Sequence, residues 1–184
     1  MKPALSGWLD GARQCLSPNR DDRPPECTVD LLVIHSISLP PGEFGGPWID
    51  RLFQNRLPAD AHPYFREIHQ LKVSAHLLIR RDGELVQYVP LQARAWHAGE
   101  SCFEGRERCN DYSIGIELEG NDETPYTDIQ YRVLADTIQR IREQYPGITP
   151  ARITGHCHIA PERKSDPGPT FDWERLQALL ATAG

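Results

Sequence analysis

The chain has 184 residues, 26 acidic and 20 basic side chains, and a formal net charge of −6 at pH 7. This length suits one domain that buries roughly two thirds of the surface of its unfolded chain. The acidic balance and the lack of any run of five or more basic residues argue against a nucleic-acid-binding surface.

No stretch of the sequence reaches the length of a transmembrane helix, and residues 1–16 lack the apolar core of a secretory signal. The 5 cysteines are odd in number and irregularly spaced, which is typical of a reduced protein without a disulfide framework. We therefore expect a cytoplasmic protein without a membrane or nucleic-acid partner. Residues 1–184 are predicted to form one domain, in which residues 1–26 are an irregular extension on the surface.

The first regular element is predicted at residues 28–36, a β-branched and aliphatic run typical of a strand buried on both faces. His35 stands at its end. Residues 39–47 are rich in proline and glycine, which indicates a long loop that could flank a site, and residues 48–53 follow as a short helix.

A β-hairpin is predicted next, because residues 74–80 and 84–89 flank an Asp-Gly pair. Residues 113–119 then alternate as a strand, and Glu117 points away from its more apolar face. Thr127 opens a long helix of 3.6-residue period with the capping-box pattern S/T-x-x-Q.

The end of the chain is predicted to carry a short strand at residues 151–154 that leads to His156, and a last helix capped by Asp172. Between them, residues 155–169 hold two histidines and three prolines and indicate a stiff loop without helix or strand. Strands and helices interleave around a hairpin, which favours an α/β domain with a central mixed sheet flanked by helices.

A metal site is the first chemical hypothesis. Catalytic zinc takes three nitrogen or oxygen ligands and leaves a fourth position open, and His35, His156 and Asp166 offer such a set. Their spacing matches no local motif. His158 is an alternative ligand, because side chains two apart in an extended segment share a face, and residue types alone leave the choice between His156 and His158 open.

Glu117 is the best candidate for a general base, because burial among apolar neighbours raises the pKa of a carboxyl group. Glu119 lies on the same face of the predicted strand and is its rival. Lys164, two residues before Asp166, could place an ammonium group beside a developing oxyanion. Trp96 and His97 are interpreted as pocket lining.

Six separated segments, in order, carry a family resemblance. They are LLVIHSISLPPGEFGGPWI, VSAHLLIRRDGELVQYVP, RAWHAG, GRERCNDYSIGIELEG, YTDIQY and GHCHIAPERKSDPGP. The chain resembles the AmpD family of cytoplasmic 1,6-anhydro-N-acetylmuramoyl-L-alanine amidases from about Gly7 to Trp173. Broader relatives are the phage-lysozyme-type amidases and peptidoglycan recognition proteins, which share a mixed sheet, surrounding helices and a zinc ion in a surface groove.

The resemblance implies zinc bound by His35, His156 and Asp166, with Glu117 and Lys164 acting in catalysis. It also implies a small-molecule substrate, an anhydro-muramyl peptide from recycled cell wall, cut at the amide bond between anhydromuramic acid and L-alanine. We expect the enzyme to be a monomer. The candidate substrate-binding residues are Ser36, Lys72, His76, Trp96, His97 and Arg108.

Three positions depart from the family pattern. Ser36 replaces a typical asparagine thought to touch the sugar, and Lys72 replaces a common arginine, which loses bidentate carboxylate binding. His158 replaces an aspartate in the motif GHCDIAP.

Two other functions compete with that of a cytoplasmic amidase. A peptidoglycan-fragment receptor without metal is opposed by retention of the three ligands, Glu117 and Lys164. An amidase of polymeric wall would need export.

Overall fold

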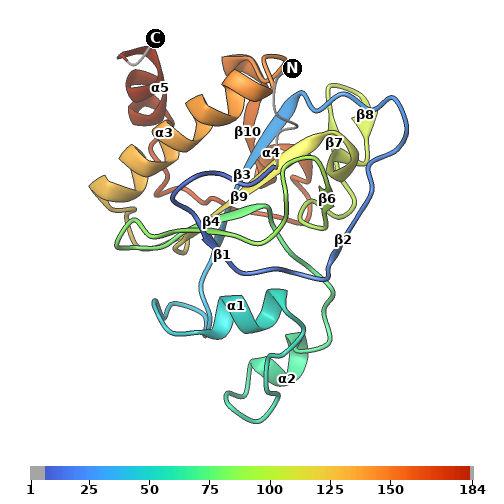
Figure 1. Ribbon diagram of the computed structural model, residues 1–184. Coiled ribbons are helices and arrows are strands. Elements are labelled where there is room, and N and C mark those ends of the chain that lie inside the picture. Colours follow the sequence, from blue (N-terminus) through green and yellow to red (C-terminus); the bar gives the residue numbers. More distant parts are fainter. Residues whose placement is uncertain (1–6, 183–184) are drawn as a thin grey trace.

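The buried run Leu31–Ile37 forms β3, and the sheet is built around it (Figure 1). The structure is a computed structural model that describes residues 7–182. Leu31 to Ile34 have no exposed surface, because β3 pairs in parallel with β9 (Ser113–Glu119) on one side and β10 (Ile153–Gly155) on the other. Both neighbours therefore end at the same edge of the sheet as β3.

The predicted hairpin is confirmed as the antiparallel pair β4 (Leu77–Ile79) and β5 (Leu85–Gln87). β4 also pairs in parallel with β9, and β1 (Arg13–Gln14) extends the sheet in parallel with β5. The strand order is β1-β5-β4-β9-β3-β10. This is the mixed sheet that the interleaved sequence pattern predicts.

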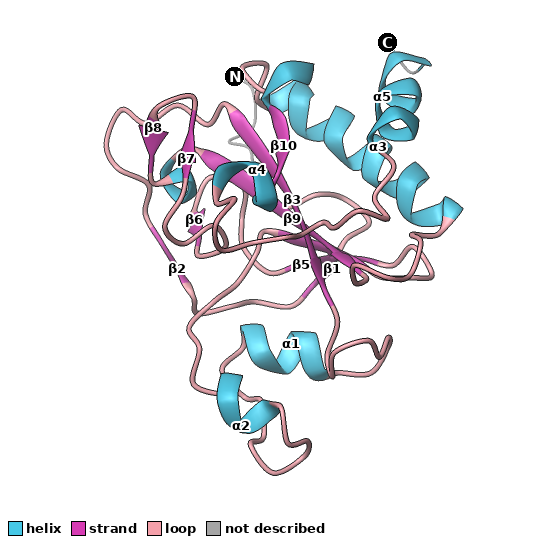
Figure 2. Cartoon of the chain, turned by 180° about the vertical axis from the view of Figure 1, so that it is seen from behind, coloured by secondary structure: helices cyan, strands magenta, loops and turns pink. Residues whose placement is uncertain are grey.

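The helices α3 (Asp128–Gln144) and α5 (Trp173–Thr182) cover one face of the sheet, away from α1 and α2 (Figure 2). The predicted capping box is present, with a 3.3 Å bond from Gln130 N to Thr127 Oγ1 and a 3.1 Å bond from Thr127 N to Gln130 Oε1. Asp172 accepts the Arg175 N–H at 2.9 Å and caps α5 as predicted. The main apolar core lies between these helices and the sheet and includes Ile34, Leu77, Ile116, Leu134, Ile138 and Leu176.

The other face of the sheet carries two smaller apolar clusters. One packs α1 (Trp48–Phe53) and α2 (Phe65–Ile68) against the hairpin, and the other lies at the start of β3, around Tyr112 and Ile159. His35 and Glu117 belong to neither cluster, although both are buried on this face. The polar site thus occupies a break in the apolar layer.

The segment predicted as an irregular surface extension is packed into the domain from residue 7 onward. Besides β1, it contains β2 (Arg20–Asp21), which pairs with β6 (Arg94–Ala95). Ser17 and Asn19 are buried and donate to the backbone carbonyl of Phe53. The prediction of a surface extension was wrong because the polar side chains of this segment bind backbone groups of the rest of the domain rather than solvent.

The end of the chain also differs from prediction. A 3-10 turn, η2 (Pro150–Arg152), precedes β10, and His156 begins α4 (His156–Ile159), where a loop without helix was expected. Three short elements complete the fold, β7 (Cys102–Phe103), β8 (Arg106–Glu107) and η1 (Cys109–Asp111). Within residues 7–182, no helix is both long and apolar enough to cross a membrane.

Candidate metal centre and catalytic groove

His35, His156 and Asp166 meet although long stretches of chain separate them. The Nδ1 atoms of the two histidines are 3.0 Å apart, and Asp166 Oδ2 lies 3.1 Å from His35 Nδ1 and 3.0 Å from His156 Nδ1. The parallel register pairs Gly155 with Ile34, so His35, within β3, and His156, just after β10, are each one residue beyond this pair. The loop after α4 then returns Asp166 to them.

The protonation of these groups suits a cation. His156 Nε2 lies 3.1 Å from the carbonyl oxygen of Ala98, which only accepts, so Nε2 carries the hydrogen and Nδ1 is left bare. Burial lowers the pKa of His35 to about 4, so its ring is neutral at pH 7. Burial raises the pKa of Asp166, but its contacts with the His156 and His35 rings outweigh this and hold the pKa below its usual value, so Asp166 is a carboxylate at pH 7.

Three lone-pair atoms in a buried triangle repel one another unless a positive charge lies between them. Two imidazole nitrogens and one carboxylate oxygen are the donor set of many catalytic zinc sites. The residues present therefore fit a zinc ion.

Glu117 lies next to the triangle, because the register of β9 on β3 pairs it with His35. Its side chain is buried, and Oε2 has no hydrogen-bond partner among residues 7–182. Burial, and then the negative charge of Asp166, raise the pKa of Glu117 well above its usual value. A carboxylate that has a raised pKa and an oxygen without a partner, and that lines a cavity, has the properties of a general base.

Glu119, the rival on the same strand, is fully engaged elsewhere. Its carboxylate accepts the N–H of Gly45 at 2.6 Å and that of Arg81 at 3.1 Å, and it pairs with the Arg80 guanidinium at 3.4 Å. Glu119 therefore attaches the loop of residues 39–47 to the sheet. Because its carboxylate is already bound, Glu117 is the better candidate for the general base.

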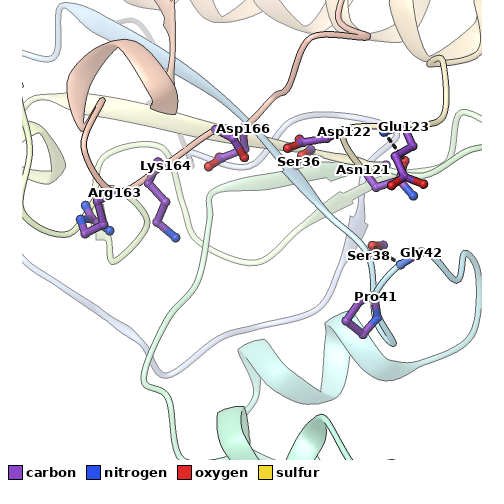
Figure 3. A pocket seen from close by; sticks show the side chains of 12 residues that line it. Ser36, Ser38, Pro41, Gly42, Asn121, Asp122, Glu123, Arg163, Lys164 and Asp166 are labelled. Carbon is purple, nitrogen blue, oxygen red and sulfur yellow. Dashed lines mark hydrogen bonds between the residues drawn. The ribbon is translucent and has the colours of Figure 1, made fainter.

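Two neighbouring cavities share lining residues, among them Asp166 of the triangle, and together they make up the groove. One, of about 370 Å³, is lined by His35, Glu117, Trp96 and His97 and has an apolar wall from α2 and the residues after it. The other, of about 620 Å³, is polar; Figure 3 shows its sides, with Lys164 and Asp166 opposite Asn121, Asp122 and Glu123. The residues common to both cavities are Ser36, Ser38, Pro41, Lys164 and Asp166.

The exposed side chain of Lys164 makes no ion pair with any residue from 7 to 182, which leaves its ammonium group available at the junction of the two cavities. Ser36, Trp96 and His97 also line the groove, and their contact with substrate remains a prediction. The Trp96 indole N–H donates to Asp21 Oδ1 at 3.0 Å, which fixes the ring against the N-terminal segment.

His76, predicted to bind substrate, is placed where substrate does not reach. It has no exposed surface and lines neither cavity. Its Nδ1 accepts the N–H of Gly115 at 3.0 Å, and its Nε2 lies 3.1 Å from the carbonyl oxygen of Ala93. Its role is to join β9 to the segment before β6, and the earlier assignment is wrong.

Lys72 and Arg108 are exposed and line neither cavity. Arg108 pairs with Asp111 at 3.2 Å, and its side chain is 72% exposed. Both cations remain predictions as contacts to an extended ligand.

His158 lies on a different side of α4 from His156, because neighbours two apart in a helix point in different directions. Its Nδ1 lies 3.3 Å from Gly155 N and 3.3 Å from Thr154 Oγ1, and its ring packs 5.7 Å from the ring of Trp173. His156 and His158 therefore do not face the same metal site, contrary to the expectation from an extended segment. His158 caps the helix turn that presents His156.

The Asn121–Glu123 side of the polar cavity and the wall formed by Tyr64, Ile68 and Leu71 were not predicted from sequence. A usable signal was present for the first group: these residues directly follow β9, and ligands gather beyond the carboxyl ends of parallel strands.

Comparisons with known proteins agree on one family. The model of the N-acetylmuramoyl-L-alanine amidase family matches residues 25–169. The 1,6-anhydro-N-acetylmuramyl-L-alanine amidase AmpD of Escherichia coli K12 is 61% identical over 95% of this chain and 95% of its own. The amidase of the same name from Haemophilus influenzae is 54% identical over 95% of each chain.

Solved structures give the same result. A crystal structure of an AmpD selenomethionine derivative superposes with a TM-score of 0.93 at 60% identity, covering 95% of this chain and 97% of that one. The E. coli amidase AmiD, solved with anhydro-N-acetylmuramic acid-L-Ala-D-γ-Glu-L-Lys as its substrate, has a TM-score of 0.61 at 30% identity and covers 85% of this chain and 60% of its own.

Proposed function

The chain belongs to the N-acetylmuramoyl-L-alanine amidase family, and we propose that its groove holds a catalytic zinc ion on His35, His156 and Asp166. The enzyme hydrolyses the amide bond between N-acetyl-1,6-anhydromuramic acid and the L-alanine of recycled muropeptides. The assignment of the reacting centre rests on Glu117 Oε2, which has no hydrogen-bond partner within residues 7–182 and lies beside three converging lone-pair atoms.

Zinc in this site would supply a Lewis acid that polarises the scissile carbonyl group and makes water more acidic. Glu117 accepts the proton of the attacking water and later passes it to the nitrogen of L-alanine as the amide bond breaks. A carboxylate with a raised pKa suits both steps, because it takes a proton more readily than an ordinary carboxylate and can still pass it to the more basic leaving nitrogen.

Lys164 carries a positive charge at the junction of the two cavities, where the scissile bond would lie. The carbonyl oxygen becomes negative as the tetrahedral intermediate forms, and a nearby ammonium group stabilises that charge more than it stabilises the neutral amide. Lys164 is therefore proposed as the oxyanion partner.

The two-sided groove fits a substrate with a sugar on one side of the scissile bond and a peptide on the other. Ser36, Trp96 and His97 are proposed to contact it near the reacting centre. Lys72 and Arg108 are proposed to neutralise stem-peptide carboxylates further out. A monomeric enzyme in the cytoplasm remains the prediction from sequence.

The test uses purified protein and anhydro-muramyl tripeptide, with mass analysis of the products. We expect free tripeptide and anhydro-N-acetylmuramic acid, loss of the reaction with a chelator, and recovery when zinc is restored. Intact peptidoglycan sacculi serve as the contrasting substrate and should be cut far more slowly. Undiminished cleavage after metal removal would contradict the zinc assignment, and preference for sacculi would contradict the substrate assignment.

A further inference from the structure

The outer nitrogens of both candidate ligand histidines face the same dipeptide, His97–Ala98. His35 Nε2 lies 2.9 Å from His97 Nδ1, and His156 Nε2 lies 3.1 Å from the carbonyl oxygen of Ala98. The rings of His35 and His97 meet edge to face, at 89°. One short segment thus contacts the outer nitrogen of each ligand on the side away from the metal site.

For His35, the direction of the hydrogen bond depends on His97. If His97 Nε2 donates to Ser113 Oγ, which is 3.1 Å away, its Nδ1 is bare and accepts from His35 Nε2. His35 then presents a bare Nδ1 to the metal site. The opposite tautomer of His97 would put a hydrogen on His35 Nδ1 and block metal binding there.

The dipeptide itself is held by Asn110, in η1. Asn110 Oδ1 accepts the N–H of His97 at 3.1 Å and that of Ala98 at 2.8 Å, and the Asn110 side chain is buried. These two backbone donors fix the orientation of the Asn110 side-chain amide. They also fix the direction in which the His97–Ala98 dipeptide faces.

Space for the His97 ring comes from β9. A Cβ atom added to Gly115 would stand 2.6 Å from two atoms of that ring. Gly115 has an ordinary backbone conformation, so the missing side chain serves close packing rather than a turn. The ring position is therefore fixed by shape as well as by hydrogen bonds.

We propose that His97–Ala98, clamped by Asn110 and Ser113, is a positioning unit that holds both ligand histidines as tautomers with a bare Nδ1. His97 and Asn110 are positioning residues, since they act on the metal through its ligands. The inference rests on the proposed metal site and gives His97 a second role beside its proposed contact with substrate.

The test compares His97→Leu with His97→Asn. Asparagine and leucine have similar shapes, but only asparagine places an acceptor oxygen where Nδ1 was. We expect His97→Leu and Asn110→Leu to weaken zinc binding by about 10–100-fold, and His97→Asn to keep most of the affinity. Leu134→Ala, in the core beneath α3, is the control: it destabilises the fold and should leave zinc affinity unchanged.

Two readouts separate this inference from the proposed function. Zinc dissociation constants come from competition with a chromophoric chelator, and the tautomer of each histidine comes from ¹⁵N–¹H NMR of zinc-free protein. His35 and His156 should carry hydrogen on Nε2 in the wild type, and His97→Leu should lose this preference at His35.

Equal zinc affinity in His97→Leu and His97→Asn, or an unaltered His35 tautomer in His97→Leu, would overturn the positioning role. A wild type with the expected tautomers but without stoichiometric zinc would instead refute the metal assignment and leave the positioning unit standing.

Discussion

Replacing Glu117 with glutamine removes the proposed base while keeping the size of the side chain. General-base catalysis contributes about 10²–10⁴-fold, so we expect kcat to fall by that factor, which is about 3–5 kcal/mol in activation free energy. Zinc content should not change, because Glu117 is not among the three converging atoms.

The same replacement should stabilise the zinc-free protein. The usual pKa of 4.5 applies to Glu117 in the unfolded chain, and burial raises the pKa in the folded chain. The stability linked to this group is therefore complete below pH 4.5 and is lost as the pH rises through the raised folded pKa. Glutamine avoids the buried, unpaired charge, and we expect a gain of about 1–3 kcal/mol at pH 8.

The assay is urea unfolding of zinc-free protein from pH 4 to pH 8, together with kcat of the zinc-loaded enzyme. Glu119→Gln is the matched control on the same strand, since its carboxylate is paired with Arg80 and bound by two backbone N–H groups. It should lower stability and leave kcat within a few-fold of the wild type. A Glu117→Gln variant with normal kcat, or with no gain in stability at pH 8, would refute the reasoning.

Three further predictions concern Lys164, His158 and His76. Lys164→Met should lower kcat by about 10²–10³-fold without loss of zinc, measured by kinetics and metal analysis; unchanged kcat would exclude an oxyanion role. His158→Asp should keep activity and zinc, because a carboxylate can cap Gly155 N–H in the same way, and a loss of zinc would show that His158 does more than cap. Burial lowers the pKa of His76 from 6.5 to about 3, so its neutral form supports stability above pH 6.5 and up to about 5 kcal/mol is lost as the pH falls toward 3. His76→Asn should flatten this part of the curve of unfolding free energy against pH, and an equally steep curve would show that other groups control it.

Local sequence was enough for much of the fold. The apolar run at β3, the Asp-Gly hairpin and the capping box at Thr127 are local signals, and each element formed close to its predicted position, with shorter strands in the hairpin than expected. The segment of residues 7–26 was not predictable in this way. Its structure depends on partners far along the chain, such as Val86 and Gln87 for β1 and the Phe53 carbonyl for Ser17 and Asn19.

The sequence by itself determined the chemistry available to the site: imidazoles at 35 and 156, carboxylates at 117 and 166, and an ammonium at 164, with their arrangement implied by a family resemblance. Tertiary structure decided which groups are free. Glu119 is bound by Arg80 and Gly45, whereas Glu117 Oε2 has no hydrogen-bond partner in the described part of the chain. His158 is turned away by the single turn of α4, and His76 is enclosed beneath β9. Such distinctions depend on contacts between segments distant in sequence, which residue type and spacing alone do not predict.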